Sequence, residues 1–423
     1  MRGGGVVQLM QRMARAALTA RRAALGLLAS AAAFALLLAG RDGGTPGAGA
    51  LLASEGEARV VVPLRSLVDP SRLRIGTAYN DARVWDEGDP AGQFRYEKVL
   101  ADHFSVVTAE NACKPSAIMR NASGPPDFVA CDRVLAFAKA NDMAFRLHVL
   151  SWGDWNPKWM KELPATERRA ALLAYTRTVL EHYAGQVDYV DVVNEAVCDE
   201  VVFTSAKQNC GSGPGQLKSG QWVPAVSDYL GETFRLAREL CPSCKLVYND
   251  YGFESDADIV DPRKYERVLA TVGEAKRAGV PIDAVGFQFH ISTQYSGNGM
   301  VGMAFRGYLA GVSRVFTQFA ALGVELHVTE IDVGCSPPTI PCPWETMAWR
   351  DAQQAEVYAG VLRVCLQNVA CTIYQSWGFT DRYSWRDSGG VNQTAHAFDR
   401  NLAPKLAYWA MVDTLRMHAI ASA

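Results

Sequence analysis

Several familiar signatures are missing from this chain of 423 residues, and each absence removes a class of protein. The formal net charge is only −2, so no basic excess suits a nucleic acid or an anionic membrane as partner. No glycine-rich loop follows the first predicted strand, which argues against a dinucleotide-binding sheet. No His-x-His pair ends that strand and no second Cys-x-x-Cys accompanies Cys241 to Cys244, so we expect neither a metal nor a cofactor.

Charge is also absent from the run Ala23 to Ala39, which follows a basic stretch without acidic residues that ends in Arg21-Arg22. A basic start followed by an apolar run is typical of an export signal. A retained anchor is the alternative, because the run is near the lower length limit for a spanning helix. We expect an export segment with its small-residue stretch over 1–50, a linker over 51–66 and a catalytic domain over 67–417. The protein is then periplasmic or extracellular, with no membrane contact beyond the export segment.

Cysteine is present ten times, and most cysteines lie close to another in the sequence. Local pairs in an exported chain are typical of disulfides that close loops in an oxidising compartment. Zinc at Cys241 and Cys244 is the alternative, although further ligands at suitable spacing are missing. The connectivity stays open; the neighbouring pairs are Cys113/Cys131, Cys198/Cys210, Cys241/Cys244, Cys335/Cys342 and Cys365/Cys371.

From about Leu67 onward, short apolar runs alternate with longer segments whose apolar residues recur every three or four positions. The short runs predict strands at Arg74–Tyr79, Ser105–Ala109, Ala144–Val149, Tyr189–Val193, Lys245–Asn249, Ala284–Phe289, Glu325–Thr329 and Thr372–Ser376. The longer segments predict helices, among them Phe128–Ala140, Thr166–His182, Val226–Leu240, Pro262–Ala278, Gly307–Leu322 and Arg350–Gln367. This alternation predicts an α/β fold, a single (β/α)8 TIM barrel, rather than an open doubly wound sheet.

In such a barrel the active site lies at the C-terminal ends of the strands. Residues at or just after nearly every predicted strand end can carry charge or form hydrogen bonds, and several are aromatic. They include Asn80, Glu110, Asn111, Lys114, His148, Trp152, Asn194, Glu195, Asn249, Asp250, Tyr251, Gln288, His290, Glu330, Asp332, Trp377 and Asp381.

Two carboxylates each follow an apolar run: Glu195 after Val-Asp-Val-Val-Asn and Glu330 after Leu-His-Val-Thr. Strands four and seven lie on roughly opposite walls of an eight-stranded barrel, so these side chains can face each other across its mouth. Glycoside hydrolysis needs such a pair, and a separation of about 5–5.5 Å gives net retention. Salt-bridged structural glutamates are the alternative, but burying both carboxylates unpaired would be costly.

The neighbours suit these two roles. Asn194 could donate to the sugar hydroxyl beside the anomeric carbon. His290 could hydrogen-bond Glu330, with Asp332 orienting the imidazole. A polar patch for ring hydroxyls is expected from Glu110, Asn111, Lys114 and His148, and stacking surfaces from Trp152, Trp377 and Trp385.

These residues give the chain a resemblance to the glycoside hydrolase family 10 endo-β-1,4-xylanases over about 70–415. Thr-Ala-Glu110-Asn111-Ala-Cys-Lys114 is similar to the family's Glu-Asn-x-x-Lys element, which binds sugar on the non-reducing side of the cut. Asp191-Val-Val-Asn194-Glu195-Ala resembles the acid/base motif and Thr329-Glu330-Ile-Asp332-Val the nucleophile motif. The remaining matches are Arg146-Leu-His148-Val-Leu-Ser-Trp152, Asn249-Asp250-Tyr251, Gly286-Phe-Gln288-Phe-His290, Trp377-Gly378 with Ser384-Trp385, and Pro404-Lys405-Leu-Ala-Tyr408.

The resemblance implies a (β/α)8 barrel that hydrolyses internal β-1,4 bonds of xylan with retention, Glu195 being the acid/base and Glu330 the nucleophile. It implies further substrate contacts from Asn249, Tyr251 and Gln288. Xylan or xylo-oligosaccharide is then the partner, and we expect a monomer.

The chain departs from the family pattern at three positions on the non-reducing side of the site. Gly153 stands where the family usually has His, Trp155 where it has Gln, and Gly252 where its Asn-Asp-Tyr-Asn element has the last Asn. We expect the second sugar from the cut to be held differently, with Trp155 offering a stacking surface.

Other activities remain open from the sequence. The same barrel could act on aryl β-xylosides, mixed-linkage glucan or a decorated glycoside, and the three departures favour keeping these alternatives. A sugar-binding protein on a degenerate barrel is a further alternative, although it would typically lack one of Glu195 and Glu330. A metal-dependent hydrolase is disfavoured because His148 and His290 lie on separate predicted strands.

Overall fold

The computed structural model describes residues 59–199, 216–258, 261–292, 303–335, 347–387 and 391–422. The expected export segment over 1–50 lies outside these residues. One compact unit spans Val61–Ala423, so it begins inside the stretch expected to be a linker. There Leu64, the first residue of the 3-10 helix η1 (Leu64–Leu67), is fully buried. At the other end the last helix continues to Ser422, beyond the expected end at 417.

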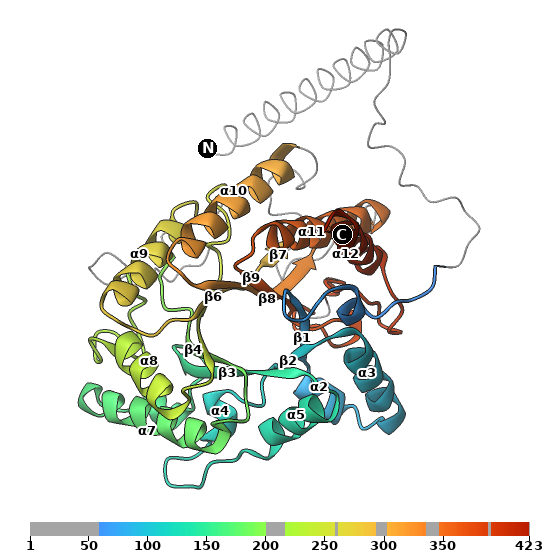
Figure 1. The fold of residues 1–423 in the computed structure, drawn as a ribbon. Helices are drawn as coiled ribbons and strands as arrows, with labels where there is room; N and C mark the ends of the chain where they lie inside the picture. Colours follow the sequence, from blue (N-terminus) through green and yellow to red (C-terminus); the bar gives the residue numbers. More distant parts are fainter. Residues whose placement is uncertain are drawn as a thin grey trace, which may run out of the picture. The chain divides into compact units, whose positions relative to one another are not determined.

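Parallel strands alternate with helices and close into a barrel (Figure 1). From β1 to β6 each strand pairs with the next one along the chain. The ring then continues from β6 to β8 and from β8 to β9, and β9 pairs with β1 to close it. This confirms the predicted (β/α)8 barrel. Its strands are β1 (Arg74–Tyr79), β2 (Val106–Ala109), β3 (Ala144–Trp152), β4 (Tyr189–Asn194), β5 (Lys245–Asp250), β6 (Ala284–Phe287), β8 (Glu325–Gly334) and β9 (Cys371–Ser376).

Helices surround this ring in Figure 1. All six helices named from the sequence are present, with ends shifted by a few residues, and the structure adds the long helices α3 and α12 and some short ones. The helices are α2 (Asp81–Asp86), α3 (Pro90–His103), α4 (Pro115–Ile118), α5 (Val129–Ala140), α6 (Lys158–Lys161), α7 (Ala165–Tyr183), α8 (Tyr229–Leu240), α9 (Lys264–Arg277), α10 (Met303–Ala320), α11 (Met347–Gln367) and α12 (Leu406–Ser422), with a 3-10 helix η3 (Asp381–Tyr383).

The sixth predicted strand, Ala284–Phe289, is not continuous. It ends at Phe287, and a short strand β7 (His290–Ser292) resumes the pairing with β8. Ala284 pairs with Glu325, whereas His290 pairs with Asp332, so the register advances by one residue between them. Six steps from Ala284 to His290 face seven from Glu325 to Asp332, so the extra residue of this bulge lies on β8. Phe289, between β6 and β7, has φ 57°.

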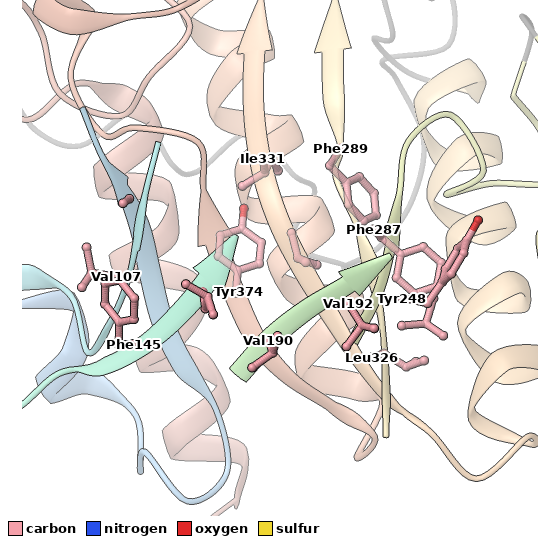
Figure 2. Packing of buried hydrophobic residues seen from close by; sticks show 14 of the residues in the cluster. Val107, Phe145, Val190, Val192, Tyr248, Phe287, Phe289, Leu326, Ile331 and Tyr374 are labelled. Carbon is pink, nitrogen blue, oxygen red and sulfur yellow. The ribbon is translucent and has the colours of Figure 1, made fainter. Parts of the chain in front are cut away.

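Successive side chains along a strand point to opposite faces of the barrel wall, so alternate residues have different surroundings. One set packs against the helices: the Phe287 ring lies 4.8 Å from Phe316 and 5.4 Å from Phe319, both on α10. Figure 2 shows further members of this apolar cluster, including Val190 and Val192 of β4.

The other set fills the barrel and is partly polar. Arg146 Nη1 on β3 lies 3.2 Å from His327 Nδ1 on β8, a contact between strands that are not neighbours and which therefore crosses the interior. Arg146 also forms an ion pair with Asp191, which His148 contacts at 2.9 Å through Nδ1. The guanidinium and carboxylate compensate each other in a site that excludes water, as buried charges must.

Disulfides join Cys113 to Cys131, Cys241 to Cys244 and Cys365 to Cys371. The zinc alternative at Cys241 and Cys244 is therefore wrong, because both sulfurs are bonded to each other. Cys198 and Cys335 are also disulfide-bonded, and their expected partners, Cys210 and Cys342, lie outside the described residues. None of the helices in the described part of the chain is both long and apolar enough to cross a bilayer.

Candidate active site

A cleft with a volume of about 970 Å³ lies at the carboxyl ends of the strands. All the site residues expected from the sequence line it except Asn249 and Asp332, which are fully buried behind its surface. Those lining it are Glu110, Asn111, Lys114, His148, Trp152, Trp155, Asn194, Glu195, Tyr251, Gln288, His290, Glu330, Trp377 and Trp385.

Glu195 directly follows β4 and is held by donors from two other strand ends. Trp152 Nε1 donates to Oε2 at 3.0 Å, and Gln288 Nε2 donates to Oε1 at 3.0 Å. The backbone of Glu195 has φ 55°, a costly conformation that its N–H stabilises by donating to the Asn249 carbonyl at 2.8 Å. Burial raises the pKa of Glu195, against the opposing effects of Lys218 and the Gln288 hydrogen bond. A raised pKa favours the protonated acid.

Glu330 lies within β8, where the pairing with β9 shifts register between Val328 and Ile331. Asn249 Nδ2 donates to its Oε1 at 2.7 Å, and His290 Nε2 lies 3.1 Å from its Oε2. Each carboxylate oxygen therefore has its own partner, which fixes the plane of the group in the cleft.

Asn249 is buried beneath the cleft and contacts Glu330 and the segment Asn194-Glu195. Its Nδ2 donates to Asn194 Oδ1 at 2.8 Å as well as to Glu330, and its Oδ1 accepts from Thr329 at 2.8 Å. A Cβ at Gly286 would lie 2.2 Å from Asn249 Oδ1, so only glycine leaves room for this amide. With both ends of its amide engaged and no surface in the cleft, Asn249 is placed to position its neighbours rather than to touch a ligand.

Asn194 presents an unused donor. Its Oδ1 accepts from Asn249 and, at 3.3 Å, from Gln288, while its Nδ2 is buried without a hydrogen-bond partner. Because leaving such a group unpaired costs free energy, and Asn194 lines the cleft, the amide is poised for an acceptor on a ligand.

His290 bridges Glu330 and Asp332. Its Nδ1 lies 2.9 Å from Asp332 Oδ2, which also accepts from Trp385 Nε1 at 2.7 Å. Burial alone would lower the pKa of His290, but Asp332 and Glu330 raise it to about 10, so the imidazole is charged at neutral pH. Burial would raise the pKa of Asp332, but the charges of His290 and Arg386 lower it to about 2. Asp332 thus holds His290, Trp385 and Arg386 together.

Glu254 holds the break between β6 and β7 at Phe289, which lies between Gln288 and His290. It is buried, and its Oε1 accepts from the backbone N–H of Phe289 at 3.0 Å and of Gly252 at 3.1 Å. Burial raises the pKa of Glu254, and the backbone N–H groups of Phe289 and of Glu254 itself oppose the shift. Gly252 has φ 68°, so the residue that departs from the family pattern occupies a left-handed turn suited to glycine.

A polar patch with aromatic walls lies at the ends of β2 and β3. Lys114 Nζ donates to Asn111 Oδ1 at 2.9 Å and lies 4.2 Å from the centre of the Trp155 ring and 5.3 Å from that of Trp152. Burial raises the pKa of Glu110 to about 7, against the opposing charge of Lys114. Trp155 is 47% exposed, so much of its ring stays open to a ligand.

Tyr251, His148 and Trp377 form further parts of the cleft wall. Tyr251 donates its hydroxyl to Asp199 at 2.7 Å, and its ring centre lies 3.7 Å from Lys264 Nζ. His148 lies edge-on to Trp377, with ring centres 5.2 Å apart.

Some lining residues had no role assigned from the sequence. Asn80, which directly follows β1, was expected at the active-site face without a role. Arg386 was not expected, although its position directly after Trp385 could have suggested it. Glu254 and Tyr308 carried no such signal, because they come from a loop and from the helix α10. In the described segments, no group of three or more His, Cys, Asp or Glu side chains could hold a metal ion.

Comparison with known proteins gives one family for nearly the whole unit. The model of glycosyl hydrolase family 10 matches residues 64–414. Endo-1,4-beta-xylanase B of Thermotoga neapolitana is 30% identical over 355 residues, which are 83% of this chain and 90% of that protein. Endo-1,4-beta-xylanase B of Neocallimastix patriciarum is 28% identical, but this chain spans only 35% of its length.

A solved structure agrees with these relatives. Xylanase 10B from Thermotoga petrophila RKU-1, in complex with xylobiose, superimposes with a TM-score of 0.70 at 29% identity. The match covers 86% of this chain and 99% of that one.

Proposed function

The chain belongs to glycosyl hydrolase family 10, and from this premise we propose that it is a retaining endo-1,4-β-xylanase. The observation that carries the proposal is the pair Glu195 and Glu330, joined through Asn194, Asn249 and Gln288 in one cleft. The xylanase relatives and the xylobiose complex of a similar structure support xylan or a xylo-oligosaccharide as the substrate.

In the first step, the Glu330 carboxylate attacks the anomeric carbon as Glu195 gives its proton to the leaving oxygen. The glycosidic bond breaks and a glycosyl ester of Glu330 forms. In the second step, Glu195, now a carboxylate, takes a proton from a water molecule. The water oxygen attacks the same carbon and releases Glu330, so the configuration is retained.

The surroundings of each glutamate suit its role. Burial raises the pKa of Glu195, which keeps a proton available for the leaving oxygen. The free Asn194 Nδ2 suits the sugar hydroxyl beside the anomeric carbon, where a hydrogen bond strengthens as positive charge develops. The hydrogen-bonded Asp332 and His290 keep Glu330 from rotating away.

The test is hydrolysis of linear xylo-oligosaccharides by the chain without residues 1–50, followed by proton NMR. We expect the β-anomer of the new reducing end to appear first and to mutarotate later. First release of the α-anomer would contradict retention, and a folded protein that cleaves nothing would contradict the xylanase activity.

Trp155 is proposed to stack on a sugar on the non-reducing side, beyond the one attached to Glu330. A Cβ at the neighbouring Gly153 would meet nothing within 4 Å, so this part of the cleft is open beside the exposed Trp155 ring. Trp155→Ala should raise KM for xylotetraose about five- to tenfold, because it removes an aromatic surface of this kind. Exposed Phe94, which does not line the cleft, offers Phe94→Ala as a control. Equal KM values for Trp155→Ala and wild type would contradict the stacking role.

Export is also proposed, on the basic start, the uncharged run after it and the disulfides, which are typical of oxidising compartments. Mass spectrometry of protein recovered outside the cytoplasm should find an N-terminus near residue 50. Retention of the complete N-terminus on a membrane would favour the anchor instead.

A further inference from the structure

An arginine stands at the rim of the cleft just after β1. Arg83 is on α2, is exposed, and lines the cleft beside Asn80 and Glu110. Its backbone N–H donates to Asn80 Oδ1 at 3.0 Å, and Asn80 Nδ2 donates to Glu110 at 2.6 Å. The turn that carries Arg83 is therefore fastened to the wall of the cleft.

The guanidinium of Arg83 is held only by neutral acceptors. Nη1 donates to the Ser384 carbonyl at 2.6 Å and Nη2 approaches the Asp387 carbonyl at 3.4 Å. Within the described residues, no carboxylate lies within 4.0 Å of it. Glu110 and Asp387 interact with its charge at longer range, but they are engaged by Asn80 and by Arg400.

Arg386 and Lys264 near the cleft are paired, whereas Lys114 donates to the neutral amide of Asn111 at 2.9 Å and lies over the Trp155 ring. Arg386 forms an ion pair with Asp332 at 2.9 Å, and Lys264 forms one with Asp199 at 2.7 Å. A guanidinium carries five N–H donors in a fork that matches a carboxylate, so Arg83 keeps donors and an unbalanced charge for a ligand.

The ring order places Arg83 away from the leaving group. Following the pairing around the barrel, β1 lies four steps from β5, which ends just before Tyr251, and three from β4, which ends just before Glu195. If Glu195 protonates the leaving oxygen, the sugars that stay attached to Glu330 extend toward the β1 side, past Glu110 and Trp385. This step rests on the proposed function.

We propose that Arg83 binds the carboxylate of a uronic acid branch on the retained part of the xylan chain. The carboxylate would accept two charge-assisted hydrogen bonds from the outer edge of the guanidinium. The cleft would then prefer acidic over neutral branches on that side.

The test compares three substrates: a linear xylo-oligosaccharide, the same chain with one α-1,2-linked glucuronic acid, and that compound with its carboxyl group reduced to an alcohol. Wild type should show a higher kcat/KM on the acidic compound than on the reduced one. Arg83→Met should lower the ratio of these two values about five- to tenfold. Arg95→Met removes an exposed arginine on α3 that does not line the cleft, and it should leave the ratio unchanged.

The possible results separate the alternatives. An unchanged ratio in Arg83→Met would overturn the carboxylate site. An equal loss on all three substrates would also overturn it, because it would mean that Arg83 only holds the loop at Ser384 and Asp387. If Arg83→Met does not fold, the wild-type ratio should still fall with added salt, since the ion pair is exposed and screened; a ratio independent of salt overturns the proposal.

Failure of the proposed function would look different. A folded wild type that leaves the linear substrate intact would reject the xylanase activity. Calorimetry would then test the carboxylate site through the affinities of wild type and Arg83→Met for the acidic and the reduced compound. Wild type should bind the acidic compound more tightly than the reduced one, and Arg83→Met should lower this ratio of affinities.

Discussion

Replacing Glu330 with alanine should lower kcat on xylo-oligosaccharides by on the order of 10⁴-fold or more, as loss of a nucleophile does in other covalent mechanisms. The reason is that Glu330 is the carboxylate that Asn249 and His290 hold in the cleft, whereas Asp332, which also contacts His290, is fully buried and paired with Arg386. Initial rates with reducing-sugar detection measure this, and the melting temperature shows whether the variant is folded. Glu239→Ala removes an exposed carboxylate on α8 and serves as the control, with an expected rate like that of wild type.

Azide distinguishes the role of Glu330 from a general loss of activity. In Glu330→Ala an azide ion fits the space left by the carboxylate and attacks the anomeric carbon directly. With an aryl β-xylobioside the product should be the α-glycosyl azide, formed by one displacement. In Glu195→Ala, azide should instead attack the glycosyl ester of Glu330 and give the β-glycosyl azide. A β-azide from Glu330→Ala would assign the nucleophile to another residue.

The positions that line the cleft were predictable because a parallel barrel collects its strand ends at one mouth. Glu195 and Glu330 each follow an apolar run, and the strand period then fixes where they emerge. The helix α3 was also open to prediction, since its buried residues Tyr96, Leu100 and His103 recur at helical spacing. The resemblance to family motifs predicted the roles of Glu195 and Glu330, which the spacing of residues along the strands alone does not assign.

The contacts that fix the side chains of Glu195 and Glu330 were not predictable from the sequence. The break at Phe289 and the extra residue that faces it on β8 depend on how β6 and β7 pair with β8, and a run of apolar residues does not encode them. Glu254 reaches Phe289 from a loop distant in sequence. The family resemblance implied that Asn249 contacts the substrate, but its amide is hydrogen-bonded to Thr329, Asn194 and Glu330. Such details depend on long-range packing, which sets side-chain direction within a strand end.

The charge state of the site follows from the same packing. Asp332 and Glu330 raise the pKa of His290 to about 10, whereas the unfolded imidazole titrates near its ordinary 6.5. Its contribution to stability is therefore complete below pH 6.5 and is lost as the pH rises toward 10. The cleft thus keeps a cation beside Glu330 at neutral pH.

Replacing Glu195 with alanine should affect substrates according to how much their leaving group needs a proton. Hydrolysis of xylo-oligosaccharides should slow by about 10²–10⁴-fold, the usual contribution of general acid catalysis. Formation of the glycosyl ester from a dinitrophenyl β-xylobioside should change far less, because that leaving group departs as a stable anion. A burst of dinitrophenol followed by slow turnover is then expected, since the second step still lacks its base.

The pH dependence of activity tests the role of Glu195 as proton donor independently. Burial raises the pKa of Glu195, and the first step needs its protonated form, so wild-type activity should fall on the alkaline side as that proton is lost. The alkaline limb should disappear in Glu195→Ala when ester formation from the dinitrophenyl substrate is followed by stopped-flow absorbance. Persistence of that limb, or an equal loss on both leaving groups, would assign proton donation to another group in the cleft. Glu110, with a pKa raised to about 7, would be the first to examine.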